Sequence, residues 1–208
     1  TYFDERGFDD ETLEKFDIGS LGSEKFNLRD YCLLNGYDIE DLEALGLVSS
    51  KNQMDIYRSR LIFPIKSISG RTIGFGARIL DNNKKSAKYI NSPESKIYNK
   101  SNVLFGLYNS KNEIVKKDSC LIAEGYTDVM RFHQIGINNI VSSSGTALTV
   151  SQISLIRRLT KNVTMLFDSD KAGVNATERA IELLLSQGMN IDICLSLIHI
   201  SEPTRPLT

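Results

Sequence analysis

Two stretches of the sequence decide the fold: Cys120-Leu121-Ile122-Ala123-Glu124-Gly125-Tyr126-Thr127-Asp128 and Val163-Thr164-Met165-Leu166-Phe167-Asp168-Ser169-Asp170. In each, a short apolar run with the composition of a strand ends directly in acidic residues. The acids are Glu124, Asp128, Asp168 and Asp170. Two strands that end in carboxylates are the feature from which both fold and chemistry can be predicted.

Strand-like and helix-like segments alternate around these two stretches, from residue 118 to residue 195. Helices are expected after the first run to about Gln134, near 150–159 and near 172–187, and further strands at 139–141 and 191–194. Such alternation with short links predicts an α/β fold with a mostly parallel sheet, covering helices and right-handed crossovers.

The four acids suggest a metal site. Sites in open α/β sheets form at the carboxyl ends of strands, so Glu124, Asp168 and Asp170 converge if their strands are neighbours. Close carboxylates repel unless a cation neutralises them, and oxygen-only ligands favour Mg²⁺ or Mn²⁺. Gly125 is expected to permit a tight turn, and Asp128 falls in the first helical turn. Alternatively, Asp168 or Asp170 only caps the next helix.

The first half of the chain has a different pattern. Residues 1–50 are expected to form short helices in a small helical lobe. Residues 61–65 and 72–79 are rich in strand formers and are separated by Ser69-Gly70, which predicts a hairpin. Pro64 favours an edge or an irregularity in its strand. Residues 81–102 are expected to be a long polar connection, so this half is a mixed α+β lobe.

Charge is unevenly distributed along the chain. Residues 1–57 hold five Lys/Arg and fourteen Asp/Glu, whereas residues 58–100 hold ten Lys/Arg and two Asp/Glu. The basic block suggests a local surface for a polyanion, or else a solvated charged face.

The remaining composition fits an ordinary globular protein. Apolar runs are shorter than a bilayer requires, and the start, which lacks both Met and a signal pattern, is interpreted as a cut within a longer protein. Three scattered cysteines without a zinc spacing fit a reducing cytoplasm.

A Glu-Gly strand end followed by an Asp-x-Asp strand end resembles the Toprim domain, which topoisomerases, bacterial primases and some nucleases share. The flanking motifs, taken in order, are similar to the catalytic core of DnaG-type bacterial primases over residues 1–194. These motifs lie at residues 61–65, 70–78, 88–94, 104–108, 124–129 and 144–149. Ala77 and Ser169 stand where that family usually has Gly.

The resemblance implies a Toprim domain over 118–194, preceded by the mixed lobe over 1–117. It implies an RNA polymerase that makes short RNA primers on single-stranded DNA from ribonucleoside triphosphates, through metal-dependent nucleotidyl transfer. Glu124, Asp168 and Asp170 are then catalytic and bind Mg²⁺ or Mn²⁺, with Asp128 assisting. The residues expected to contact nucleic acid or nucleotide are Arg60, Arg78, Lys88, Tyr89, Asn91 and Lys100.

Several other residues receive weaker assignments. Arg58 and Lys171 are further candidates for phosphate contacts. Ser144-Gly145-Thr146 either offers backbone N–H groups to an anion or is an ordinary loop. His133 is expected to be structural.

Three features of the family are not found in the sequence. DnaG-type primases usually carry an N-terminal zinc-binding domain and a C-terminal domain that binds the replicative helicase, so the helicase is expected to bind through a domain absent here. Residues 195–208 lack the family's Leu-Pro-x-Gly-x-Asp-Pro-Asp segment and are interpreted as a foreign tail. The alternatives to a primase are another Toprim enzyme, such as a metal-dependent nuclease or a topoisomerase, and a non-catalytic fragment that binds single-stranded DNA.

Overall fold

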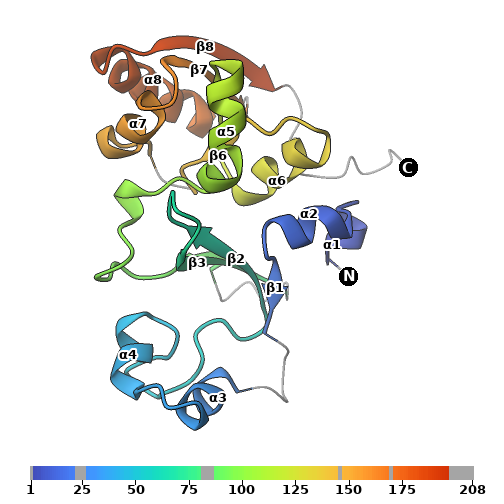
Figure 1. The fold of residues 1–208 in the computed structure, drawn as a ribbon, viewed down its shortest axis with the longest axis vertical. Coiled ribbons are helices and arrows are strands. Elements are labelled where there is room, and N and C mark those ends of the chain that lie inside the picture. The colour runs from blue at the N-terminus through green and yellow to red at the C-terminus, as the bar shows by residue number, and fades with distance from the viewer. Residues whose placement is uncertain (1, 22–26, 81–86, 145–146, 169–170, 197–208) are drawn as a thin grey trace.

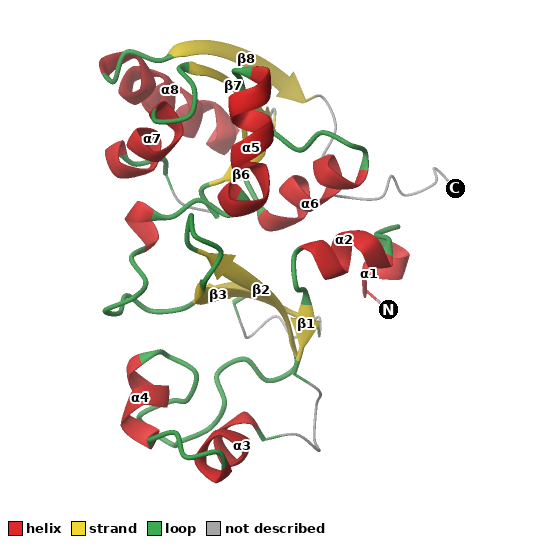
Figure 2. Cartoon of the chain, viewed as in Figure 1, coloured by secondary structure: helices red, strands yellow, loops and turns green. Residues whose placement is uncertain are grey.

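The computed structural model describes residues 2–21, 27–80, 87–144, 147–168 and 171–196, and it gives no side-chain description for 167–178 or 195–196. The described chain forms an antiparallel sheet and a parallel sheet, one above the other, with helices around them (Figures 1 and 2). The strands are β1 Gly19–Ser20, β2 Arg60–Lys66, β3 Thr72–Ile79, β4 Tyr89–Asn91, β5 Cys120–Ala123, β6 Ile140–Ser142, β7 Asn162–Asp168 and β8 Asn190–Ser196. The helices are α1 Tyr2–Glu5, α2 Asp10–Lys15, α3 Leu28–Leu34, α4 Ile39–Ala44, α5 Leu107–Lys117, α6 Tyr126–Gln134, α7 Val150–Arg157 and α8 Lys171–Ser186, with a 3₁₀ turn, η1, at Lys100–Asn102.

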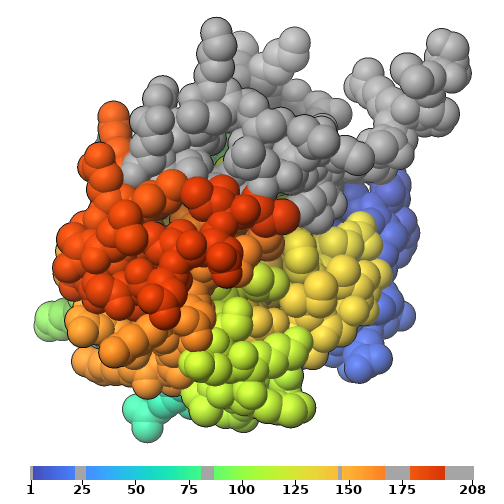
Figure 3. All heavy atoms as spheres, turned by 90° about the horizontal axis from the view of Figure 1, so that it is seen from above, coloured from blue at the N-terminus to red at the C-terminus, as the bar shows by residue number. Residues whose placement is uncertain are grey.

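The parallel sheet has the order β6-β5-β7-β8, with every pairing parallel, which confirms the predicted α/β architecture. Alternate residues of β5 face opposite layers. Ile122 joins a core with Ile153 of α7 and Leu184 of α8, whereas Ala123 joins a core with Met130 of α6. Because both faces are covered, the central strands β5 and β7 are mostly apolar on both sides. Seen from above, α8, α7, α5 and α6 form adjacent parts of one surface (Figure 3).

Helix α5 was not predicted from the sequence. It lies along the β6 edge, where Phe105 pairs with Ser142 and the Ser110 hydroxyl donates to Ile140 O at 2.7 Å. Gly106 precedes the helix with φ +82°, a backbone conformation that favours glycine. Most residues of this helix are polar, and only Leu107, Ser110 and Ile114 are buried, so its apolar pattern is short, yet it covers a sheet edge that would otherwise be open.

The antiparallel sheet has the order β1-β2-β3-β4, and its β2–β3 pairing confirms the predicted hairpin. Among the described residues, β1 pairs with Leu61 and Ile62, so Pro64 lies beyond this pairing, at a position where the described chain needs no N–H. The register also shifts between Ile65 and Lys66. Strand β4 corrects the expectation that residues 81–102 are only a connection, because Tyr89–Asn91 pairs with Gly76–Arg78.

The expected helical lobe over residues 1–50 is wrong as a single unit. Helices α3 and α4 lie at one end of the molecule, whereas α1 and α2 lie beside α6, with β1 between the two pairs in sequence (Figure 1). Arg131 and Gln134 of α6 donate to the carbonyl of Gly7 at 2.9 and 2.8 Å. Phe16 stacks on Phe105, with ring centroids 5.5 Å apart. These apolar and polar contacts hold α1 and α2 against the parallel-sheet half.

The end of the last strand also differs from the prediction. Strand β8 continues to Ser196, and Leu195 and Ser196 pair with Phe167 and Asp168. These two residues therefore belong to the sheet rather than to the expected tail. Residues 197–208 lie outside the described part of the chain. None of the described helices is long and apolar enough to cross a membrane.

His133 is a buried structural residue, as predicted. The Ser110 hydroxyl donates its proton to Ile140 O, so it accepts from His133 Nε2 at 3.0 Å. The ring also contacts Phe16 edge to face. Burial, together with the charge of Lys15, lowers the pKa of His133 to about 3.

This lowered pKa predicts a stability loss on acidification. Between about pH 6.5, where an unfolded His titrates, and about pH 3, the unfolded chain binds a proton that folded His133 does not. The free energy of unfolding should therefore fall by about 1.4 kcal/mol per pH unit from this group as pH decreases below 6.5. Denaturant unfolding from pH 7 to pH 4 should show that the free energy of unfolding of the His133→Gln variant depends less steeply on pH than that of the unaltered chain. Parallel curves for the two proteins would contradict the assignment.

Candidate active site

The acid-bearing strands are neighbours. Cys120, Leu121 and Ile122 of β5 pair with Val163, Thr164 and Met165 of β7. Glu124 directly follows β5 and is exposed, and Asp168 is the last residue of β7. Both positions therefore lie at the carboxyl edge of the parallel sheet, where sites of α/β folds form. This edge, with Glu124, Asp128 and the backbone of Asp168, is called the acid edge below.

Asp128 is fixed by the start of α6. Its Oδ2 accepts a hydrogen bond from Gly125 N at 2.9 Å, and this bond turns the carboxylate back toward the residue after Glu124. The Asp128 carboxylate therefore lies beside the backbone of Gly125, the residue that follows Glu124. The backbone of Asp168 ends the adjacent strand, whereas its side chain and all of Asp170 lie outside the described part of the chain.

Gly125 has a different role from the one expected. Its φ is −128° and its ψ is 172°, an extended conformation open to any residue, so no unusual turn requires glycine. The reason for glycine is close approach, because a Cβ at this position would lie 3.2 Å from Asp128 Oδ2. Glycine therefore leaves room for the Asp128 carboxylate.

The donor chemistry of the acid edge fits a hard divalent cation. The candidate ligands are all carboxylates, which suit Mg²⁺ or Mn²⁺. Among the side chains that the structure describes, no three His, Cys, Asp or Glu gather as a metal site. Because the side chains of Asp168 and Asp170 are outside that set, the four-acid metal site stays a prediction.

Four of the predicted nucleic-acid residues come together on the antiparallel-sheet side: Arg78, Tyr89, Asn91 and Lys100, called the basic cluster below. Arg78 pairs with Tyr89 across β3 and β4, and its Nη1 donates to the Tyr89 hydroxyl at 2.9 Å. The guanidinium also lies 4.4 Å from the centre of the Tyr2 ring. Tyr89 is 37% exposed, so part of its ring is open to a ligand.

Asn91 forms a hydrogen bond with Lys100 when its side-chain amide is oriented so that both the oxygen and the nitrogen have partners. In that orientation Oδ1 accepts from Lys100 Nζ at 2.9 Å, and Nδ2 donates to the Tyr126 hydroxyl and to Ile90 O. Lys100 lies in η1, which α7 holds through Gln152, whose Nε2 donates to Lys100 O at 3.1 Å. Strand β4 and the 3₁₀ turn η1 therefore place the polar side chains of Asn91 and Lys100 in contact with each other.

Arg60 is separate from this cluster. It is only 8% exposed, and its Nη1 donates to Ala87 O at 3.0 Å, next to exposed Lys88. Burial lowers the pKa of Arg60 from its ordinary value. The side chain supports the backbone before Lys88 and does not lie on the open surface. Arg58, the weaker candidate, is exposed.

Sequence reasoning missed Tyr126 as a site residue. Its ring stacks on Phe63 with centroids 5.0 Å apart, and burial raises its pKa, although a hydrogen bond with Ser144 opposes part of the rise. Gln152 was also missed, although Thr149-x-x-Gln152 is a capping-box pattern. Ser144 has φ +61°, and Gly145-Thr146 of the possible anion loop lie outside the described residues.

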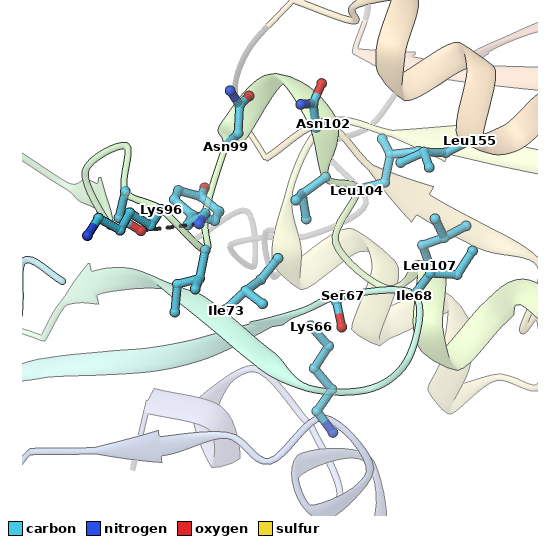
Figure 4. Close-up of a pocket in the computed structure, with 14 residues that line it drawn as sticks. Lys66, Ser67, Ile68, Ile73, Lys96, Asn99, Asn102, Leu104, Leu107 and Leu155 are labelled. Carbon is cyan, nitrogen blue, oxygen red and sulfur yellow. Dashed lines mark hydrogen bonds between the residues drawn. The ribbon is translucent and has the colours of Figure 1, made fainter.

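A pocket of about 330 Å³ lies elsewhere, between the β2–β3 hairpin, the segment around η1 and α7 (Figure 4). Its floor includes Ile73, Leu104, Leu107 and Leu155, and Lys66 at its edge pairs with Asp17. Its described lining contains none of the predicted site residues. The described residues of the candidate site therefore lie outside this pocket.

Comparisons with known families agree with these features. Residues 1–111 match the family model for the N-terminal domain of the DNA primase catalytic core, and residues 121–200 match a Toprim-like domain. The DNA primase of Clostridium acetobutylicum is 40% identical over 195 residues, which cover 92% of this chain and 32% of the relative. A Staphylococcus aureus DNA primase is 36% identical with the same coverage. The chain thus spans about a third of the length of these curated relatives.

Solved structures give the same result. A DnaG catalytic core matches with a TM-score of 0.85 and 35% identity over 94% of this chain and 63% of that chain. The RNA polymerase domain of Mycobacterium tuberculosis DnaG matches with a TM-score of 0.86 and 33% identity over 96% and 68%. A DnaG catalytic domain bound to single-stranded DNA matches with a TM-score of 0.81 and 34% identity over 94% and 64%.

Proposed function

The chain belongs to the DNA primase catalytic core family, and on that premise we propose that it is a core that synthesises RNA primers on single-stranded DNA. The observation that carries the proposal is the neighbouring pair β5 and β7, whose carboxyl ends bear Glu124 and Asp168. The basic cluster supports it, because Asn91 bonds to Tyr126, two residues from Glu124.

The proposed chemistry is nucleotidyl transfer assisted by Mg²⁺ or Mn²⁺. Glu124, Asp168 and Asp170 would hold the metal, with Asp128 beside them, and bound metal would supply charge neutralisation at the reacting phosphate. The chain's own cations, Lys100 and Arg78, would bind template or nucleotide phosphates, and the open part of Tyr89 would stack on a base.

This proposal extends to the whole primase. The division into an N-terminal lobe over 1–117 and a Toprim domain over 118–194 is part of it, as are ribonucleoside triphosphates as substrates. Binding to the replicative helicase, which the family resemblance assigns to a C-terminal domain, is proposed for the whole primase rather than for this chain.

A primer-synthesis assay tests the function. The chain is incubated with single-stranded DNA, labelled ribonucleotides and Mg²⁺ or Mn²⁺, and the same assay is run on a primase extended to the length of the curated relatives. Short RNA products are expected at least from the extended protein. Cleavage of the DNA without ribonucleotides would instead identify a Toprim nuclease. DNA binding with neither product would identify a non-catalytic binding protein.

The basic cluster and its neighbour Lys88 give a separate prediction. Arg78→Ala and Lys88→Ala should each weaken single-stranded DNA binding, because each removes an exposed or partly exposed cation. If these cations bind phosphates, the slope of log affinity against log salt should flatten by about 0.7 for each phosphate that the variant no longer neutralises. Fluorescence anisotropy at several salt concentrations measures this slope.

Lys116→Ala is the matched control. Lys116 is highly exposed, but it pairs with Glu113 at the end of α5, away from the acid edge. Its substitution should leave the salt slope unchanged. Equal slopes for all three variants and the unaltered chain would show that the basic block is only a solvated face.

A further inference from the structure

Tyr126 connects the two halves of the candidate site through its ring. Its backbone begins α6, between Glu124 and Asp128, yet its side chain packs on the antiparallel sheet. The ring stacks on Phe63 and lies over Gly76, where a Cβ would come within 2.6 Å of Tyr126 Cε2. The side chain is 4% exposed, so its position is closely determined.

The Tyr126 hydroxyl then bonds to two further segments. It forms a 2.5 Å hydrogen bond with Asn91 of β4 and a hydrogen bond with Ser144 after β6. A tyrosine hydroxyl has one proton to donate and lone pairs to accept, so it satisfies two partners at once. Asn91 in turn accepts from Lys100 Nζ at 2.9 Å. A continuous set of hydrogen bonds therefore runs from the start of α6 to Lys100.

Lys100 is held from its other side as well. Gln152 of α7 is fully buried, and its Nε2 donates to Lys100 O and to Val103 O at 3.1 and 2.8 Å. The Thr149 hydroxyl donates to Ser101 O at 2.6 Å. The backbone of η1 is thus anchored by the parallel-sheet half, and the direction of the Lys100 side chain is set by Asn91.

We propose that Tyr126 is a positioning residue that, through its hydroxyl and Asn91, sets Lys100 relative to the carboxylates of Glu124 and Asp128. This inference rests on the proposed function. It assigns the hydroxyl a role beyond packing, since the ring alone accounts for the contacts with Phe63 and Gly76. A nucleic-acid phosphate bound by Lys100 would then be held in a fixed position relative to the backbone that carries Glu124 and Asp128.

The Tyr126→Phe variant separates the two roles, because phenylalanine keeps the ring and loses the hydroxyl. We expect affinity for a single-stranded DNA oligonucleotide to fall about tenfold, the effect of removing one hydrogen bond to a polar group. The affinity for Mn²⁺, measured by titration, should change less than about twofold, and the melting temperature should fall only slightly. Asn91→Ala should reproduce the DNA-binding loss, and it tests the same bond if Tyr126→Phe does not fold.

The double variant Tyr126→Phe/Asn91→Ala decides whether Tyr126 and Asn91 act together on DNA binding. If Tyr126 acts through Asn91, the double variant should lose about as much DNA affinity as either single variant, whereas independent residues would lose about a hundredfold together. Tyr108→Phe is the control, because this tyrosine lies on α5 and contacts Lys66 and Lys111 through its ring.

Three results would overturn the inference: additive losses, a Tyr126→Phe variant that behaves like Tyr108→Phe, or an unaltered chain that does not bind the oligonucleotide. Loss of Mn²⁺ affinity and melting temperature together with DNA binding would also overturn it, because that pattern indicates a purely structural role. Failure of the proposed function has a different signature, since the primase extended to the length of the curated relatives would then bind DNA and metal but make no RNA.

Discussion

In a primase extended to the length of the curated relatives, replacement of Glu124 by Gln should abolish primer synthesis while leaving the fold intact. Gln has nearly the same shape but no charge, so it would leave a bound divalent cation with one fewer neutralising carboxylate. Glu124 is exposed and follows β5, so the strand pairing with β7 does not depend on its charge. We expect Mn²⁺ affinity to fall at least tenfold and RNA synthesis to fall below detection, with an unchanged melting temperature.

For the other acids, the size of the loss in Mn²⁺ affinity and RNA synthesis should follow the position of each residue in the fold. Asp168→Asn is expected to match Glu124→Gln, because both positions end neighbouring strands. Asp128→Asn should have a smaller effect, since the amide oxygen can still accept from Gly125 N. Glu113→Gln is the control, because Glu113 pairs with Lys116 on α5. Normal Mn²⁺ affinity and synthesis in Glu124→Gln would remove the metal-site assignment.

A side chain at Gly76 should destabilise the fold. A Cβ there would meet Tyr126 Cε2 at 2.6 Å, and the ring cannot move away because it packs between Phe63 and Phe105. Overpacking of this kind costs about 1–3 kcal/mol. We therefore expect Gly76→Ala to lower the free energy of unfolding by about that amount, and to weaken single-stranded DNA binding, since Tyr126 also holds Asn91.

Denaturant unfolding measures this effect against a matched glycine. Gly19 also lies in a strand of the same sheet, and a Cβ there would meet nothing within 4 Å, so Gly19→Ala should be nearly neutral. Replacing the ring with a smaller side chain in the double variant Gly76→Ala/Tyr126→Leu should recover part of the stability. Equal stability of Gly76→Ala and Gly19→Ala would show that the ring yields, contrary to the packing argument.

The parallel half and the hairpin could be predicted because their residues carry a local signal. Apolar runs such as Val163–Phe167, bounded by acids and helical segments, identify strands whose two faces are both covered. Strand β4 could not be identified in this way, since Tyr89–Asn91 is short and polar and is a strand only because β3 lies beside it. The separation of α1 and α2 from α3 and α4 likewise depends on the distant residues Arg131 and Gln134.

The sequence by itself determined the α/β order of the second half, the family and the two strand ends that carry acids, because residue type and spacing along the chain encode these features. Only the tertiary structure decided that Arg60 is buried beside Ala87, and that Tyr126 joins Asn91 to the acid edge. Burial and hydrogen-bond partners arise from residues far apart in sequence, and their contacts form only when the two sheets pack together.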